Sequence, residues 1–216
     1  MNTQVLSIHK RTALTQARQL LDQGQALVAP TDTVYGVMCR YDNADAIASL
    51  YEIKDRPPQK AIPVLIADTA QLAALTPLPI TPVARALMEH FWPGALTIVL
   101  PALPTLPPIL TAGQPSVAVR MPAYKPLLAL IRQSGPLAAT SANRSGQPDT
   151  RTVAEVLAQL NERVALVLQG DDGQTVGEPS TVIDVSRPQE FPRILRRGPL
   201  AGAINNVLYT IFGYAC

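Results

Sequence analysis

Hydroxyl, amide and cationic side chains recur just beyond the apolar runs of this 216-residue chain. Residues 30–36 (Pro-Thr-Asp-Thr-Val-Tyr-Gly) follow the apolar run 26–29, and residues 140–146 (Thr-Ser-Ala-Asn-Arg-Ser-Gly) follow the run 137–139. Loops beyond strand ends are where α/β sheets place ligand sites. Taken singly, each segment also fits an ordinary turn in which Thr, Ser or Asp bonds its own backbone.

Three cations, Lys54, Arg56 and Lys60, lie within seven residues, and Pro57 and Pro58 stiffen the segment between them. Such a cluster can hold phosphate groups through charge-assisted hydrogen bonds. A solvated surface cluster is the commoner alternative, and Lys54 can also complement the C-terminal end of a helix. Residues 54–60 therefore predict a phosphate-binding clamp only if other hydrogen-bond donors lie nearby.

Arginines also stand at the ends of predicted strands. Arg120 ends the apolar run 117–119, and a guanidinium is costly to bury without a partner. Its partner is either a protein carboxylate or an anionic group of a ligand. Arg196 ends another run, and Ser180 precedes the run 181–185. Together these positions predict a wide, polar and cationic groove.

The sequence lacks the signatures of several other chemistries. It contains no phosphate loop of the form G-x-x-x-x-G-K-[ST] and no G-x-G-x-x-G fingerprint. Its two histidines, His9 and His90, lie far apart, which argues against a zinc site and against a Ser-His-Asp triad. The net charge of +2 gives no field strong enough for wrapping nucleic acid. Phosphate binding would then depend on Arg, Lys, hydroxyl and backbone N–H groups.

Strand-like and helix-like segments intermingle along the chain, which predicts the α/β class with a mixed sheet. Helix starts are marked by the N-caps Thr12, Asn43 and Thr81, and by the capping box of Thr152 and Glu155. We expect helices over residues 13–23, 44–53, 82–91, 126–133, 153–161 and 201–212, and a short one after 68. We expect strands over residues 5–8, 26–29, 62–67, 96–100, 117–121, 137–140, 166–169, 181–185 and 194–196.

Composition favours one globular domain, because 47% of the residues are hydrophobic and no linker separates the elements. The first eleven residues lack the apolar core of a signal peptide. The most apolar stretch, 95–110, is interrupted by four of the chain's 21 prolines, so we expect no membrane span. Two cysteines, Cys39 and Cys216, provide no disulfide framework. These features predict a cytoplasmic protein.

Seven segments, in this order, resemble those of the YrdC-like threonylcarbamoyl-AMP synthases. They are PTDTVYG (30–36), K-D-R-x-x-x-K (54–60), WPGALTIVL (92–100), VAVRMP (117–122), TSANRSG (140–146), STVIDV (180–185) and LRRG (195–198). Each segment is weak alone, but their shared order makes the resemblance strong. It covers residues 12–200, and it implies one YrdC-like domain over 1–216: a twisted mixed parallel/antiparallel sheet with helices on both sides of a positively charged cavity.

The resemblance implies a nucleotidyltransferase that uses L-threonine, bicarbonate and ATP with Mg²⁺, and releases diphosphate and threonylcarbamoyl-AMP. The product then serves N6-threonylcarbamoyladenosine formation in tRNA through downstream transfer proteins. No protein-bound metal site is expected. The chain ends before the extra C-terminal domain of longer members, which favours a short, single-domain form.

Site roles follow from the resemblance, residue by residue. It implies L-threonine contacts at Thr33, Arg120, Thr140 and Ser180. It implies ATP contacts at Lys54, Arg56, Lys60, Ser116, Ser141, Asn143 and Arg196, of which Lys54 and Arg56 are also the expected catalytic residues.

Two departures leave alternatives open. Residues 37–40 (Val-Met-Cys-Arg) replace a Leu-Gly-Cys-Asp-like run, so the floor of the pocket is expected to differ. Asp55 stands where a glycine is common, and it is expected to add a negative charge to the phosphate clamp. One alternative is a paralogue that uses another carbamoyl acceptor. The other is a non-catalytic module that binds double-stranded RNA or tRNA through its phosphates.

Overall fold

Ten strands form one mixed sheet in the computed structural model, which describes residues 2–57, 59–171 and 177–213. The order of the strands across the sheet is β1-β8-β2-β3-β7-β4-β6-β5-β9-β10. The strands are β1 (Gln4–Ser7), β2 (Leu27–Pro30), β3 (Tyr35–Arg40), β4 (Val64–Leu65), β5 (Leu96–Pro101), β6 (Ser116–Arg120), β7 (Leu137–Ser141), β8 (Leu166–Gln169), β9 (Thr181–Asp184) and β10 (Arg193–Arg196). Parallel pairs such as β5 with β9 and antiparallel pairs such as β5 with β6 confirm the mixed sheet.

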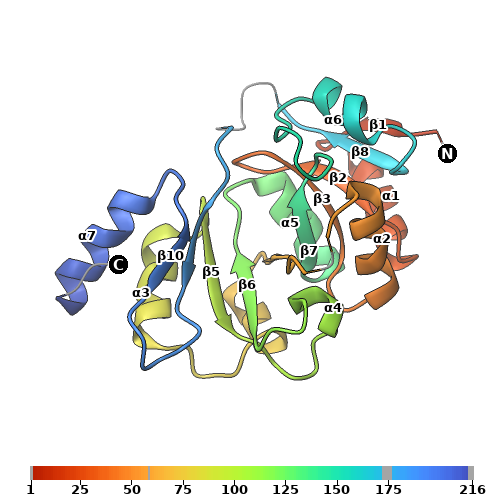
Figure 1. The fold of residues 1–216 in the computed structure, drawn as a ribbon. Coiled ribbons are helices and arrows are strands. Elements are labelled where there is room, and N and C mark those ends of the chain that lie inside the picture. The colour runs from red at the N-terminus through yellow and green to blue at the C-terminus, as the bar shows by residue number, and fades with distance from the viewer. Residues whose placement is uncertain (1, 58, 172–176, 214–216) are drawn as a thin grey trace.

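Helices pack on both faces of this sheet (Figure 1). They are α1 (Arg11–Asp22), α2 (Ala44–Lys54), the 3₁₀ helix η1 (Thr69–Ala74), α3 (Pro82–Phe91), α4 (Pro108–Thr111), α5 (Lys125–Ser134), α6 (Val153–Leu160) and α7 (Ala201–Phe212).

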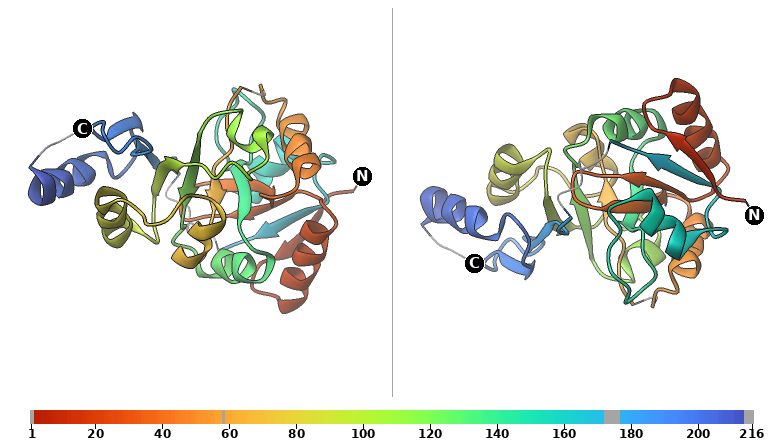
Figure 2. Two further views of the ribbon diagram at one scale, coloured as in Figure 1. Left: turned by 90° about the horizontal axis from the view of Figure 1, so that it is seen from below. Right: turned by 90° about the horizontal axis from the view of Figure 1, so that it is seen from above.

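The apolar core is divided by the sheet into two clusters, because successive strand side chains point to opposite faces. Leu27 and Ala29 of β2 pack with α1 and α5, whereas Val28 belongs to the cluster that contains α2, α3, α4, α6 and α7. Figure 2 shows α1 and α5 on one side of the sheet and α2 on the other. Helices α3 and α7 lie together at the β9–β10 end (Figures 1 and 2). No helix among the described residues is long and apolar enough to cross a membrane.

The predicted helix starts are largely confirmed. Asn43 accepts a hydrogen bond from the backbone N–H of Ala46 at 2.9 Å and so caps α2. Thr152 and Glu155 form the predicted capping box of α6. Helix α7 spans the predicted residues 201–212. Local hydrogen-bonding chemistry, which depends on a few neighbouring residues, therefore sets the starts of α2 and α6.

Other predictions were wrong. Helix α1 begins at Arg11 with Lys10 as its N-cap, so Thr12 lies inside the helix. The segment expected as strand 62–67 pairs as a strand only over β4, residues 64–65. A short helix, α4, interrupts the proline-rich loop between β5 and β6.

Strand β3, which pairs antiparallel with β2 after a tight turn, was not predicted. The Thr31 hydroxyl closes that turn by accepting from the backbone N–H groups of Thr33 and Val34, at 3.0 and 3.2 Å. Residues 31–34 therefore form a hairpin turn, which confirms the alternative in which Thr bonds the backbone of its own turn.

Candidate functional site

A cavity of about 410 Å³ opens where the β2–β3 turn meets β5, β6, β7, β9 and β10. Its wall consists of hydroxyl groups, guanidinium groups and short apolar side chains. The predicted site residues on this wall are Thr33, Arg56, Arg120, Thr140, Ser141, Ser180 and Arg196. Segments that are distant in the sequence thus meet at one place, as the strand-end pattern predicts.

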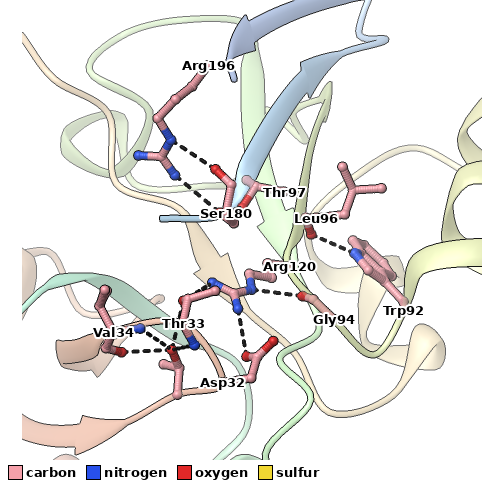
Figure 3. Close-up of polar contacts among 11 residues, drawn as sticks. Asp32, Thr33, Val34, Trp92, Gly94, Leu96, Thr97, Arg120, Ser180 and Arg196 are labelled. Carbon is pink, nitrogen blue, oxygen red and sulfur yellow. Dashed lines mark hydrogen bonds and ion pairs between the residues drawn. The ribbon is translucent and has the colours of Figure 1, made fainter. Parts of the chain in front are cut away.

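Arg120 forms one polar cluster with Asp32 and Thr33, which we call the Arg120 cluster (Figure 3). Its guanidinium donates to Thr33 Oγ1 at 2.8 Å, to Asp32 Oδ1 at 2.6 Å and to the Gly94 carbonyl at 3.0 Å. Arg120 is 6% exposed, and this burial lowers its pKa while Asp32 acts in the opposite direction. Three of the five guanidinium N–H groups are used among the described residues, which leaves two for a ligand.

The hydroxyl of Thr33 is oriented by its neighbours. Thr31 Oγ1 donates its proton to the Val34 carbonyl at 2.7 Å, and a hydroxyl has only one proton. The two threonine hydroxyl oxygens lie 3.0 Å apart. Thr33 Oγ1 accepts from Arg120 at 2.8 Å, so its hydroxyl is held beside the guanidinium at the cavity wall.

Ser180 and Arg196 meet on the opposite side of the cavity (Figure 3). Arg196 donates to the Ser180 carbonyl at 2.9 Å and to Ser180 Oγ at 3.1 Å. Thr97 Oγ1 lies 2.8 Å from Ser180 Oγ. Gly198 permits this close approach of strands, since a Cβ there would lie 2.6 Å from the Pro179 carbonyl oxygen. Burial lowers the pKa of Arg196.

Lys54 lies behind the wall and is 2% exposed. Its ammonium donates to the carbonyls of Ser141 and Asn143 and, at 3.1 Å, to Asn143 Oδ1. Ser141 Oγ donates to the same Asn143 Oδ1 at 2.5 Å. We call these three residues the Lys54 cluster. Desolvation, aided by the nearby charge of Arg56, lowers the pKa of Lys54 to about 7.

The other predicted cations differ in position. Arg56 reaches the cavity wall while it donates to the carbonyls of Lys60 at 3.3 Å and Ala61 at 3.0 Å, and desolvation lowers its pKa. Lys60 is exposed, and Ser116 pairs with Pro101 at the start of β6. Among the described residues, neither Lys60 nor Ser116 lines the cavity, and Asn143 reaches it only through Ser141.

Neither of the two departures in the sequence lies on the cavity wall. Residues 37–40 lie along β3, beyond the lining residue Gly36, so the expectation of a different pocket floor was wrong. Burial raises the pKa of the Cys39 thiol to about 12, which keeps it protonated and unreactive at neutral pH. Cys216 lies outside the described residues.

Asp55 was expected inside the phosphate clamp. Its carboxylate instead points away from the clamp and binds Arg144 and Arg163.

Three residues of the site were not predicted. Asp32 and Thr97 stand inside the quoted segments, and each binds a predicted residue. Asp149 lines the cavity, and its charge partly offsets the lowering of the pKa of Lys54 and of Arg196 that burial causes. The position of Asp149, shortly after segment 140–146, was the feature of the sequence that could have indicated it.

Within the described part of the chain, no three His, Cys, Asp or Glu side chains come close enough together to hold a metal ion.

Comparisons with known proteins agree with this geometry. The Sua5/YciO/YrdC family model, described as telomere recombination, matches residues 19–198. A threonylcarbamoyl-AMP synthase of Bacillus subtilis is 43% identical over 86% of this chain and 53% of its own length. The crystal structure of Pyrococcus abyssi Sua5 in complex with L-threonine has a TM-score of 0.88 and 32% identity, over 98% of this chain and 62% of that one. The chain thus spans about half the length of the first of these curated relatives.

Proposed function

The chain belongs to the Sua5/YciO/YrdC family, and from this premise we propose that it is a threonylcarbamoyl-AMP synthase. It would be a nucleotidyltransferase whose substrates are L-threonine, bicarbonate and ATP. The observation that carries the proposal is the Arg120 cluster, a buried guanidinium and an oriented hydroxyl on the wall of the 410 Å³ cavity. This combination suits an amino acid that has both a carboxylate and a hydroxyl group.

The reaction has two steps. The threonine amine attacks the carbon of bicarbonate, which gives a carbamate and water. A carbamate oxygen then attacks the α-phosphorus of ATP, and the bond between this phosphorus and the oxygen bridging to the β-phosphate breaks. The products are threonylcarbamoyl-AMP and diphosphate. Positioning of the reactants and neutralisation of phosphate charge dominate the catalytic demand.

L-Threonine would bind at the Arg120 cluster. The two remaining N–H groups of Arg120 fit the α-carboxylate, because a guanidinium fork matches carboxylate geometry. Asp32 holds the fork in a fixed orientation through its 2.6 Å bond. The Thr33 hydroxyl would contact the amino acid, with Thr140 and Ser180 as further contacts on the wall.

ATP would bind along the rest of the cavity wall. Arg56 and Arg196 would supply donors for the phosphates there, and Ser141 is a further predicted contact on the wall. Lys54 and Asn143 would act behind the wall, because the ammonium and the amide hold the backbone and hydroxyl of Ser141. Lys60 and Ser116 remain predicted ATP contacts. Because neither residue lines the cavity, they could contact ATP only if the nucleotide extended beyond it.

Mg²⁺ would enter with ATP as the counter-ion of its phosphates, which is how this ion usually meets nucleotide sites. Because ATP and tRNA are cytoplasmic, we place the reaction in the cytoplasm. Proteins that transfer the threonylcarbamoyl group to tRNA would consume the product.

Diphosphate release tests the proposal. The purified protein, supplied with ATP, Mg²⁺ and bicarbonate, should release diphosphate when L-threonine is present and should release almost none without it. L-Alanine is a matched control, since it keeps the carboxylate and amine but lacks the hydroxyl that Thr33 is placed to bind. No threonine-dependent release would overturn the proposal and favour either the paralogue or the RNA-binding module.

A further inference from the structure

Several contacts join the C-terminal end of α2 to the segment 141–147, which carries Ser141 and Asn143. Inside the protein, the Lys54 ammonium binds the Ser141 and Asn143 carbonyls. Next to it, the backbone N–H of Ser145 donates to the Lys54 carbonyl at 2.8 Å. At the surface, Arg144 binds the residue that follows Lys54, which is Asp55.

The backbone at Asp55 has an unusual conformation. Asp55 is the C-cap of α2, with φ +51° and ψ +45°, in the left-handed region. Glycine adopts this region without the steric conflict that a Cβ introduces. Considered as a helix cap alone, position 55 is therefore better suited to glycine than to aspartate.

The carboxylate of Asp55, however, makes bonds that glycine cannot make. Oδ2 accepts from Arg144 Nε at 2.8 Å and from Nη2 at 2.5 Å. Oδ1 accepts from Arg163 Nη1 at 3.2 Å. The same Arg163 nitrogen donates to the Ile53 carbonyl at 3.0 Å. Each carboxylate oxygen thus binds a different arginine, and the hydrogen bonds from Arg144 and Arg163 also lower the pKa of Asp55.

These bonds connect three parts of the chain. Arg144 belongs to the segment that carries Ser141 and Asn143, and Arg163 follows α6. Gln159 of α6 adds support, since its side chain accepts from the Arg144 backbone N–H at 2.9 Å and donates to the Pro148 carbonyl at 3.1 Å. Segment 141–147 is therefore held from inside by Lys54 and from outside by Asp55.

We propose that Asp55 is a positioning residue for the nucleotide-binding part of the site: through Arg144 and Arg163 it fixes segment 141–147, and with it Ser141 and Asn143, against the end of α2. This inference rests on the proposed function for its ATP ligand. The hold on the segment itself does not depend on that function. Asp55 touches no reacting atom.

Replacement by glycine separates the two roles of the residue, because they predict opposite results. If Asp55 were only a helix cap, Asp55→Gly would relieve the backbone and leave ATP binding unchanged or improved. If the carboxylate positions segment 141–147, the same substitution raises KM for ATP about twofold to fivefold, the range expected for a half-exposed ionic bridge. KM for L-threonine stays unchanged, which separates positioning from general destabilisation.

Further variants test the bridge as a unit. Arg144→Ala should raise KM for ATP by a similar factor, and the double variant Asp55→Gly/Arg144→Ala should be no worse than either single one. Asp55→Asn keeps one acceptor oxygen and tolerates the left-handed backbone, so it should fall between wild type and Asp55→Gly. Arg187→Ala is the control, because it removes the exposed Arg187–Glu190 ion pair elsewhere on the surface and should change nothing.

Hydrogen exchange provides a readout that does not need activity. Protection of the Ser145 amide should fall in Asp55→Gly and in Arg144→Ala but not in Arg187→Ala. The proposal would be overturned if Asp55→Gly protected the Ser145 amide and bound ATP at least as well as wild type does. It would also be overturned if the Ser145 amide lost protection while KM for ATP stayed unchanged. If wild type itself neither binds ATP nor releases diphosphate, the proposed function fails, and the exchange data still decide whether Asp55 holds the segment.

Discussion

The Arg120 cluster and the Lys54 cluster both place a buried cation beside the cavity, but they use it differently. Arg120 stands on the wall, is oriented by the carboxylate of Asp32 and keeps donors for a ligand. Lys54 stands behind the wall, and its three ammonium bonds go to oxygens of Ser141 and Asn143. Within the described residues no carboxylate contacts Lys54. Under the proposed function, Arg120 would contact a ligand directly, and Lys54 would shape the segment that carries Ser141 and Asn143.

Arg120→Ala should have the largest effect and should separate the two clusters most clearly. L-Threonine binding should weaken by more than about 100-fold, the scale reported for truncating one partner of a buried charge pair. Most of the ATP affinity should remain, because the Lys54 cluster is intact. Titration calorimetry with each ligand checks both statements. Arg120→Lys is the matched control and should not rescue binding, since an ammonium lacks the planar fork. Equal loss of both ligands would contradict the assigned role.

Arg56→Ala should weaken ATP binding by about 1.5–3 kcal/mol, the scale of a hydrogen bond to a charged group. The threonine affinity should stay close to that of wild type, because Arg56 belongs to the ATP-binding part of the wall. ATP titrations of the two proteins measure the difference. An unchanged ATP affinity would remove Arg56 from the phosphate clamp.

Lys54→Met keeps the length of the side chain but leaves buried oxygens of Ser141 and Asn143 without their donor. The free energy of unfolding should fall by about 1–3 kcal/mol, the cost of an unsatisfied buried polar group. The ATP affinity should fall with it, while threonine binding is retained. Urea unfolding gives the first quantity and calorimetry the second. A stable variant with normal ATP binding would show that the Lys54 cluster does not shape the nucleotide-binding wall.

The pH dependence of stability gives an independent signal. Lys54 has a pKa of about 7 in the folded protein and about 10.4 when unfolded. Between these values the unfolded chain binds more protons, so the free energy of unfolding contributed by Lys54 rises with pH. Subtracting the curve of Lys54→Met isolates this contribution, because Cys39 and the other groups titrate in both proteins. Parallel curves from pH 7 to 10 would contradict the buried position of the ammonium.

The sequence predicted most of the fold because helix caps and apolar runs act locally. Asn43, Thr81 and the Thr152–Glu155 box form helix starts in which all the partners lie within a few residues. Strand β3 was missed because its pairing depends on the turn closed by the Thr31 hydroxyl, a geometry that composition does not reveal.

The sequence was sufficient to predict which segments form the site. It was not sufficient to predict which side chains in those segments bind one another. The sequence left the partner of Arg120 open between a protein carboxylate and a ligand, and Asp32 supplies the carboxylate from 88 positions away along the chain. The sequence also predicted that Lys54 belongs to a phosphate clamp. In the structure its ammonium binds the Ser141 and Asn143 carbonyls, because the packing of α2 against segment 141–147 decides the direction of this long side chain. Long-range contacts of this kind depend on the tertiary arrangement.

The most direct test of the division between the two clusters is the binding of ATP and of L-threonine to wild type, Arg120→Ala and Lys54→Met, measured by calorimetry. The account predicts a crossed pattern: wild type binds both ligands, Arg120→Ala loses L-threonine and keeps ATP, and Lys54→Met loses ATP affinity and keeps L-threonine. Wild type that binds neither ligand, or variants that lose both to the same extent, would contradict it.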